Sequence, residues 1–265
     1  PPPPAPPPMP QLLAFPLPFP LPARAKFGRC PGAHPPLDAR IAAACAATMV
    51  LRDDFTVVCD LKCTPSCRTS ELFRTVVAHF EQLLTGANTS SASPLPAADL
   101  PRADRRAAAP LHGVLGSVSV CVRSASEELG PSTNESYSLR VPAGAANASA
   151  DQVATLTAAT IFGARHGLES FFQLLDVRSQ GQPLQLRSAP VIIDDEPRFA
   201  YRGLMIDSSR HFLPLHHIKH IIATAAQVKL NVIHWHMTDT QSFSTGSATF
   251  PELAAKGAFP NGYSG

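Results

Sequence analysis

This sequence has no large excess of positive or negative charge, no apolar run long enough to span a membrane, and no dense set of cysteines. Twenty-two Lys and Arg stand against 20 Asp and Glu, which leaves a formal net charge of +2 over 265 residues. This balance argues against a protein that works mainly by attraction to nucleic acid or to an anionic membrane. The apolar run at 41–51 has 11 residues, too few to span a bilayer, and fits a buried helix or a strand equally well.

Six cysteines are too few for a disulfide scaffold at this length. Cys59, Cys63 and Cys67 lie four residues apart, but the second pair of ligands that a zinc site usually takes from farther along the chain is absent. Structural disulfides are therefore the better prediction, with a metal site as the alternative.

Three Asn-x-Ser/Thr sequons occur, at Asn88, Asn134 and Asn147. Each lies among Ser, Ala, Gly or Pro, so we expect loops that could carry glycans in a secretory lumen. The sequons and cysteines together favour a lysosomal or extracellular location.

Prolines crowd one end of the chain, with 15 of the 28 within the first 36 residues. Proline lacks the backbone N–H, so this crowding excludes a regular helix or a central strand there. We expect a proline-rich low-complexity segment at 1–44, an α+β domain at 45–197 and the start of a second domain at 198–265.

The middle segment combines strand and helix patterns, which predict an antiparallel sheet with helices. Residues 69–84 form an amphipathic helix pattern that Thr69 or Ser70 could cap. Alternation at 117–122 and again at 137–141 predicts two antiparallel neighbours. The stretch 151–175 reads as one helix whose Gly163 and Gly167 allow close packing onto the sheet, and 191–196 closes the domain as a strand.

The pattern changes after Pro197. Residues 202–207 form a short apolar strand, Pro214 opens an amphipathic helix, and 230–236 form a second apolar strand. Strand, helix and strand with continuous apolar strands predict a parallel βαβ unit.

Polar residues follow the carboxyl ends of both strands, and parallel strands place those ends on one edge of the sheet. Asp207 and Arg210 follow the first strand, and His236 and Asp239 the second. Arginine is suited to gripping a hydroxylated substrate through its rigid fork of donors.

Two points stay open at this stage. Asp207 could contact substrate or form a buried salt bridge with Arg210 or Arg202. His234 and His236, two apart on a strand, could bind a metal with Asp239, although we expect hydrogen bonds to neighbours or substrate and no metal or other cofactor.

Long motifs then carry a family resemblance. They are Tyr201-Arg202-Gly203-Leu204-Met205-Ile206-Asp207-Ser208-Ser209-Arg210-His211-Phe212-Leu213-Pro214, Lys229-Leu230-Asn231-Val232-Ile233-His234-Trp235-His236-Met237-Thr238-Asp239 and Phe250-Pro251-Glu252-Leu253. They closely resemble the family 20 glycoside hydrolases, the β-N-acetylhexosaminidases of lysosomal, plant and insect type. Upstream, Asn134–Leu139 and Thr160–Phe171 look like the family's small N-terminal domain.

This resemblance implies an α/β protein, in which a small α+β domain with an antiparallel sheet precedes the first βα units of a (β/α)8 TIM barrel, truncated here. It implies hydrolysis of terminal non-reducing β-linked N-acetylglucosamine or N-acetylgalactosamine, in which the substrate's own acetamido oxygen attacks the anomeric carbon. The partner is then an N-acetylhexosamine-terminated oligosaccharide or glycoconjugate, with no nucleic acid and no membrane span, and family members often dimerise.

The resemblance also assigns roles to residues. Arg210 matches the arginine that binds sugar hydroxyls, with Asp207 beside it, and Asp239 matches an acid of the network behind the general acid, with His236 near it. Cys67 and Cys121 lie near the places of a family disulfide. The family's catalytic Asp-Glu pair lies on the fourth barrel strand, which we expect beyond residue 265, so we expect no catalytic residue and no activity in this chain alone.

Two alternatives remain for the function. One is a non-catalytic carbohydrate- or partner-binding paralogue that keeps Arg210 without the acid. The other is a proline-rich interaction protein whose tract recruits SH3- or WW-like modules.

Overall fold

A computed structural model describes residues 25–27, 47–60, 63, 69–89, 111–144, 151–176 and 183–258. The chain divides into two compact units. Unit 1 comprises Pro1–Glu128 and Asn134–Glu196, and unit 2 comprises Leu129–Thr133 and Pro197–Gly265.

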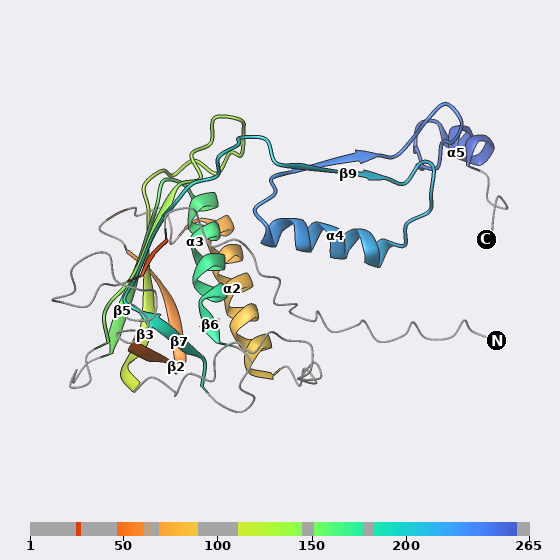
Figure 1. The fold of residues 1–265 in the computed structure, drawn as a ribbon. Coiled ribbons are helices and arrows are strands. Elements are labelled where there is room, and N and C mark those ends of the chain that lie inside the picture. Colours follow the sequence, from red (N-terminus) through yellow and green to blue (C-terminus); the bar gives the residue numbers. More distant parts are fainter. Residues whose placement is uncertain are drawn as a thin grey trace, which may run out of the picture. The chain divides into compact units, whose positions relative to one another are not determined.

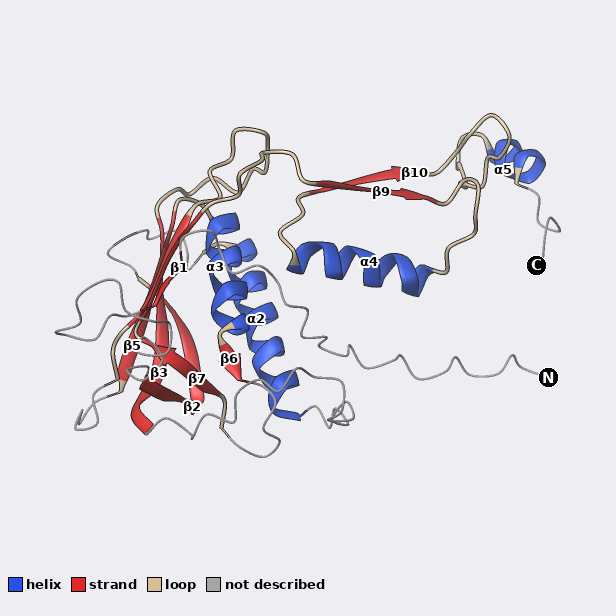
Figure 2. Cartoon of the chain, in the orientation of Figure 1, coloured by secondary structure: helices blue, strands red, loops and turns tan. Residues whose placement is uncertain are grey.

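Unit 1 is built on one mixed sheet of eight strands, which makes the chain an α/β protein (Figure 2). Along the sheet the strand order is β1-β8-β4-β5-β3-β2-β7-β6. The strands are β1 (Ala25–Phe27), β2 (Ala47–Cys59), β3 (Leu111–Val122), β4 (Tyr137–Val141), β5 (Gln152–Ala158), β6 (Leu175–Asp176), β7 (Gln185–Ala189) and β8 (Val191–Asp195).

Two helices, α2 (Glu71–Thr89) and α3 (Ile161–Gln173), pack against each other and lie along one side of this sheet (Figure 1). The predicted helix at 69–84 is confirmed as α2. Ser70 caps it, because its hydroxyl accepts a hydrogen bond of 2.8 Å from the backbone N–H of Phe73. Thr160 caps α3 in the same way by accepting from the N–H of Gly163.

The prediction of one helix over 151–175 is wrong in its first third. Residues 152–158 form strand β5, in which Ala154, Leu156 and Ala158 are buried while the residues between them are not. This two-residue period and the β-branched Val and Thr of the segment favour a strand, and the helix begins only after the cap at Thr160.

The predicted antiparallel sheet is also only partly right. Strand β3 runs parallel to both of its neighbours, β2 and β5, while the other pairings are antiparallel. The expected pairing of β3 with β4 does not occur, because β5 lies between them and β4 pairs with β5 and β8. The prediction assumed that strands next to each other in the sequence also pair, whereas β5, a later strand, lies between β3 and β4 in the sheet.

Strand β1 lies inside the segment that the sequence predicts to be proline-rich and of low complexity. Residues 25–27 pair with β8 at the edge of the sheet, where the described residues provide no second neighbour. The remainder of 1–46 lies outside the described residues.

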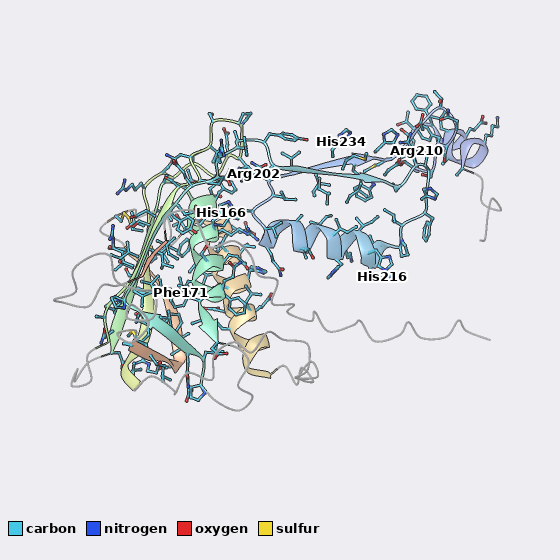
Figure 3. All side chains as sticks on the ribbon, in the orientation of Figure 1. His166, Phe171, Arg202, Arg210, His216 and His234 are labelled. Carbon is cyan, nitrogen blue, oxygen red and sulfur yellow. A yellow bond between two sulfur atoms is a disulfide. The ribbon has the colours of Figure 1, made fainter. Side chains whose placement is uncertain are left out.

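The core of unit 1 sits between the helices and the sheet. Phe171 of α3, labelled in Figure 3, stacks on Phe55 of β2 with ring centroids 5.7 Å apart, and its ring centroid lies 6.0 Å from that of Phe80 of α2. Gly163 and Gly167 allow α3 to approach closely, as the sequence predicts. A Cβ at Gly163 would lie 2.6 Å from the carbonyl oxygen of Ser136.

A disulfide links Cys63 to Cys121, with the Cα atoms 5.5 Å apart. The predicted pairing of Cys121 with Cys67 is therefore wrong, and Cys67 itself lies outside the described residues. The fold gives the reason. The N–H of Asp60, just after β2, bonds to Val120 of β3, and the N–H of Cys63 bonds to Asp60, so the turn brings Cys63 to the end of β3.

Unit 2 contains β9 (Gly203–Asp207), α4 (Leu215–Gln227), β10 (Val232–His236) and α5 (Pro251–Gly257). The strands β9 and β10 are parallel, which confirms the predicted βαβ unit, and α4 begins directly after Pro214. Across the described part of the chain, no helix combines the length and the apolar character that crossing a membrane requires.

Candidate functional site

The candidate site lies where β9 and β10 end. The parallel register places Asp207 opposite His236, so the last residues of both strands meet. The N–H of Ser208 then bonds to the carbonyl of His236 at 3.0 Å, which holds the two outgoing loops together. The edge predicted from the sequence therefore exists in the structure.

Asp207 shapes the loop that follows β9. Its Oδ1 accepts hydrogen bonds from the backbone N–H of Ser209 at 3.0 Å and of Arg210 at 3.2 Å, while Oδ2 pairs with Arg210 Nε at 2.5 Å. Of the two arginines considered for a salt bridge, Arg210 is thus the partner. Arg202 instead donates to the carbonyls of Lys229 and Phe199.

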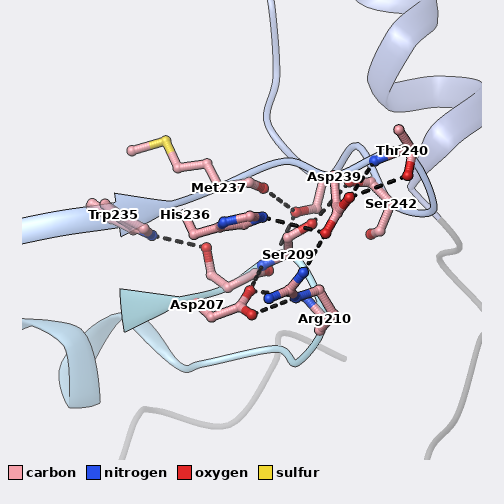
Figure 4. A network of polar contacts seen from close by, with 11 residues as sticks. Asp207, Ser209, Arg210, Trp235, His236, Met237, Asp239, Thr240 and Ser242 are labelled. Atoms are coloured by element: carbon pink, nitrogen blue, oxygen red, sulfur yellow. Dashed lines mark hydrogen bonds and ion pairs between the residues drawn. The ribbon is translucent and has the colours of Figure 1, made fainter. Parts of the chain in front are cut away.

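Arg210 bridges two carboxylates, one from each loop. Its Nε pairs with Asp207 and its Nη1 with Asp239 (Figure 4). Half of the side chain remains exposed. Because a guanidinium carries several N–H donors in a rigid plane, these pairs fix its orientation and leave donors for a ligand.

Charge and hydrogen bonds keep both carboxylates ionised. Partial burial acts to raise the pKa of Asp207, but donation from the backbone and side chain of Arg210 outweighs it and the pKa lies below its usual range. The N–H of Thr240, followed by the Arg210 side chain, lowers the pKa of Asp239. The same contacts with Asp207 and Asp239 raise the pKa of Arg210.

The two histidines of β10 differ in their surroundings. The Nε2 of His236 lies 3.5 Å from Oδ2 of Asp239, whereas His234 is exposed. Among the residues that the structure describes, no group of three or more His, Cys, Asp or Glu is arranged to hold a metal ion.

The contacts by which hydroxyl groups support this edge of the sheet were not predicted from the sequence. Ser209, almost fully buried, donates from Oγ to the carbonyl of Ser242 at 3.0 Å and so ties the β9 loop to the β10 loop. The indole N–H of Trp235 donates to Oγ of Ser208 at 2.9 Å. A Ser-Ser pair directly after a strand is a weak signal for the first contact, and nothing in the sequence marks Ser242.

The three sequons fall in different surroundings. Asn134 is exposed in a loop, where its Oδ1 accepts from the N–H of Ser136 at 2.9 Å. The loop expected around Asn88 is wrong, since this residue lies in the last turn of α2. Asn147 lies outside the described residues.

An arginine held between carboxylates presents oriented donors at the carboxyl ends of parallel strands, the edge at which α/β proteins bind their ligands. The family comparisons are more specific. Residues 199–263 match the model for the glycosyl hydrolase family 20 catalytic domain, and residues 56–174 match the model described as beta-acetyl hexosaminidase like. The chain belongs to glycoside hydrolase family 20.

Curated relatives match over about half of the chain. It is 46% identical over 143 residues to Beta-hexosaminidase 1 of Arabidopsis thaliana, covering 54% of this chain and 26% of that protein. It is 42% identical over 128 residues to Beta-hexosaminidase subunit beta of Homo sapiens, covering 48% and 21%. The chain thus spans about a quarter of the length of these relatives.

Solved structures agree at the level of the fold. The chitobiase of Flavobacterium johnsoniae matches with a TM-score of 0.57 at 24% identity, over 90% of this chain and 29% of that one. A Streptomyces plicatus β-hexosaminidase in complex with GlcNAc matches with a TM-score of 0.54 at 24% identity, over 88% and 37%.

Proposed function

We propose that the protein carrying this chain is a β-N-acetylhexosaminidase. We further propose that the Arg210 corner, formed by Asp207, Arg210 and Asp239, holds the terminal sugar. The bridge from Arg210 to Asp207 and Asp239 supports this most directly, because it presents oriented donors at the carboxyl edge of the sheet. The substrate is a glycan or glycoconjugate that ends in β-linked N-acetylglucosamine or N-acetylgalactosamine.

The residues that this chain contributes to the site bind and orient the sugar, and they do not donate a proton to the leaving group. Both carboxylates pair with Arg210, and the low pKa of each keeps it ionised where a general acid must be protonated. The leaving-group proton therefore comes from another carboxylic acid of the complete protein. In substrate-assisted hydrolysis the acetamido oxygen of the bound sugar is the nucleophile, so the protein needs no nucleophile of its own.

We also propose that β9, α4 and β10 are the first elements of a (β/α)8 barrel. Their parallel pairing and helical crossover fit such a start. A barrel takes about 250 residues, and residues 201–265 supply only 65 of them. The polypeptide of 265 residues expressed alone should therefore not turn over a chromogenic β-N-acetylglucosaminide above a vector-only control.

The test of the function uses the complete protein and the variant Arg210→Ala. Charge-assisted hydrogen bonds contribute about 1.5–3 kcal/mol, so kcat/KM for a β-N-acetylglucosaminide should fall about 10- to 100-fold. Lys219→Gln, at an exposed site on α4, is the matched control and should behave like the unmodified protein. Equal kcat/KM for Arg210→Ala and the unmodified protein would contradict the role of Arg210. A complete protein that binds the sugar without hydrolysing it would support a non-catalytic paralogue.

We place the protein in the lysosome or outside the cell. The disulfide between Cys63 and Cys121 supports an oxidising compartment, and Asn134 is exposed for a glycan. Protein secreted from a eukaryotic host should lose one glycan mass when Asn134 is changed to Gln. An unchanged mass after this substitution would exclude Asn134 as a glycosylation site.

A further inference from the structure

Helix α4 carries three exposed imidazoles that the sugar site does not use. His216, His217 and His220 are all exposed, whereas Ile218 and Ala225 of the same helix are buried. At about 100° per residue, the three histidines occupy one arc of the helix surface that faces away from the buried pair. Figure 3 shows His216 on the side of α4 away from β9 and β10.

Two of these histidines lie on neighbouring turns of the helix. His216 and His220 are four residues apart, so their Cβ atoms lie about 5–6 Å from each other on adjacent turns. Helical side chains lean toward the N-terminus, which tilts His220 back over His216. The His216 ring also lies beside the ring of His217, with centroids 4.2 Å apart.

Neutral imidazole is a preferred ligand of Zn²⁺, Cu²⁺ and Ni²⁺, and two histidines at this spacing on one helix face can bind the same ion. No group of three or more ligand side chains among the described residues is arranged to hold a metal. Among the described residues, a site on α4 therefore has two protein donors, and water or a further donor takes the remaining positions.

We propose that His216 and His220 form a surface chelate for a divalent transition-metal ion on the exposed face of α4. This site is separate from the Arg210 corner and does not depend on hexosaminidase activity. The affinities should follow the order of imidazole complexes, with Cu²⁺ bound more tightly than Ni²⁺ or Zn²⁺.

The test is a calorimetric titration of the complete protein, purified without a histidine tag, with CuCl₂, NiCl₂ and ZnCl₂ near neutral pH. His216→Gln and His220→Gln each remove one donor and should weaken the Cu²⁺ affinity by about tenfold or more, because even changes to groups that only support a metal ligand cost that much. Lys219→Gln, an exposed change on the same helix, is the matched control and should keep the affinity within about twofold. His217→Gln removes the ring beside His216 and tests the competing pair of His217 and His220.

The result that would overturn the chelate is equally specific. If His216→Gln or His220→Gln binds Cu²⁺ as the unmodified protein does, the pair does not form the site. If His217→Gln causes the same loss as His220→Gln, the ligands are three residues apart and the proposed pair is wrong. Circular dichroism of each variant checks that the fold is unchanged, and glycosidase activity is not the readout.

Discussion

The two units bury their apolar side chains to very different degrees. In unit 1 the helices and the sheet enclose a continuous core that includes Phe80, Phe171 and Leu156, each nearly or completely buried. In unit 2 only Ile206, Ile218 and Ala225 are buried among the apolar residues described, while Phe199, Tyr201, Phe212, Leu215 and Phe250 are at least 62% exposed. The strand pair and crossover helix of unit 2 thus fix the geometry of a site without a core of their own, as expected of the first elements of the barrel proposed above.

The largest expected consequence is a difference in resistance to proteolysis. Among the described residues, trypsin should cut the purified 265-residue polypeptide first within unit 2, at sites such as Lys219 and Lys229, because few buried contacts oppose local opening there. The described strands and helices of unit 1 should be cut later, and mass spectrometry identifies the protected segments. If trypsin degrades both units at the same rate, unit 2 is not less protected than unit 1 and the prediction is wrong.

The second largest expected difference is in how much the loss of an aromatic ring from each unit lowers the free energy of unfolding. Phe171→Ala removes a ring that contacts Phe55 and Phe80, and it should lower the free energy of unfolding by about 3–5 kcal/mol. Phe199→Ala, at a residue 63% exposed in unit 2, should change it by about 0.5 kcal/mol or less. Urea denaturation followed by circular dichroism measures both, and similar values for the two variants would contradict the assignment of the core.

Two glycine substitutions in unit 1 test how closely α3 approaches the neighbouring backbone. Gly163→Ala places a Cβ against backbone atoms of Glu135 and Ser136, so it should destabilise by about 1–3 kcal/mol. Gly86→Ala, in α2, meets nothing within 4 Å and should stabilise by about 0.5–1 kcal/mol because alanine favours a helix. Thermal unfolding should show opposite signs, and the same sign for both would refute the close approach of α3.

The smallest expected effect concerns pH at the Arg210 corner. The depressed pKa values of Asp207 and Asp239 mean that their pairing stabilises the fold above the usual carboxyl pKa and is lost only as the pH falls through their lower values. The carboxyl signals of both residues in NMR spectra of the complete protein should not shift between about pH 4.5 and 7. A carboxyl that titrates within this window would show that the bridge is absent.

Local patterns were enough to predict α2, the βαβ unit and the edge at which Asp207, Arg210, His236 and Asp239 gather. The pairing of strands was not predictable, because β5 separates β3 from β4 and only long-range packing decides that order. The helix assigned across β5 failed because its apolar residues fit both periods over a short window. The partner of Cys121 depended on the turn after β2, which the spacing of the cysteines does not reveal.

The order of strands in unit 1 has a consequence for synthesis of the protein on the ribosome. Ala25 pairs with Ile193, and β2 pairs with β7, so the sheet cannot be completed until almost the whole unit has emerged. Contacts between such distant residues slow folding and leave strand edges open meanwhile. The nascent chain should therefore depend on chaperones until β8 joins the sheet.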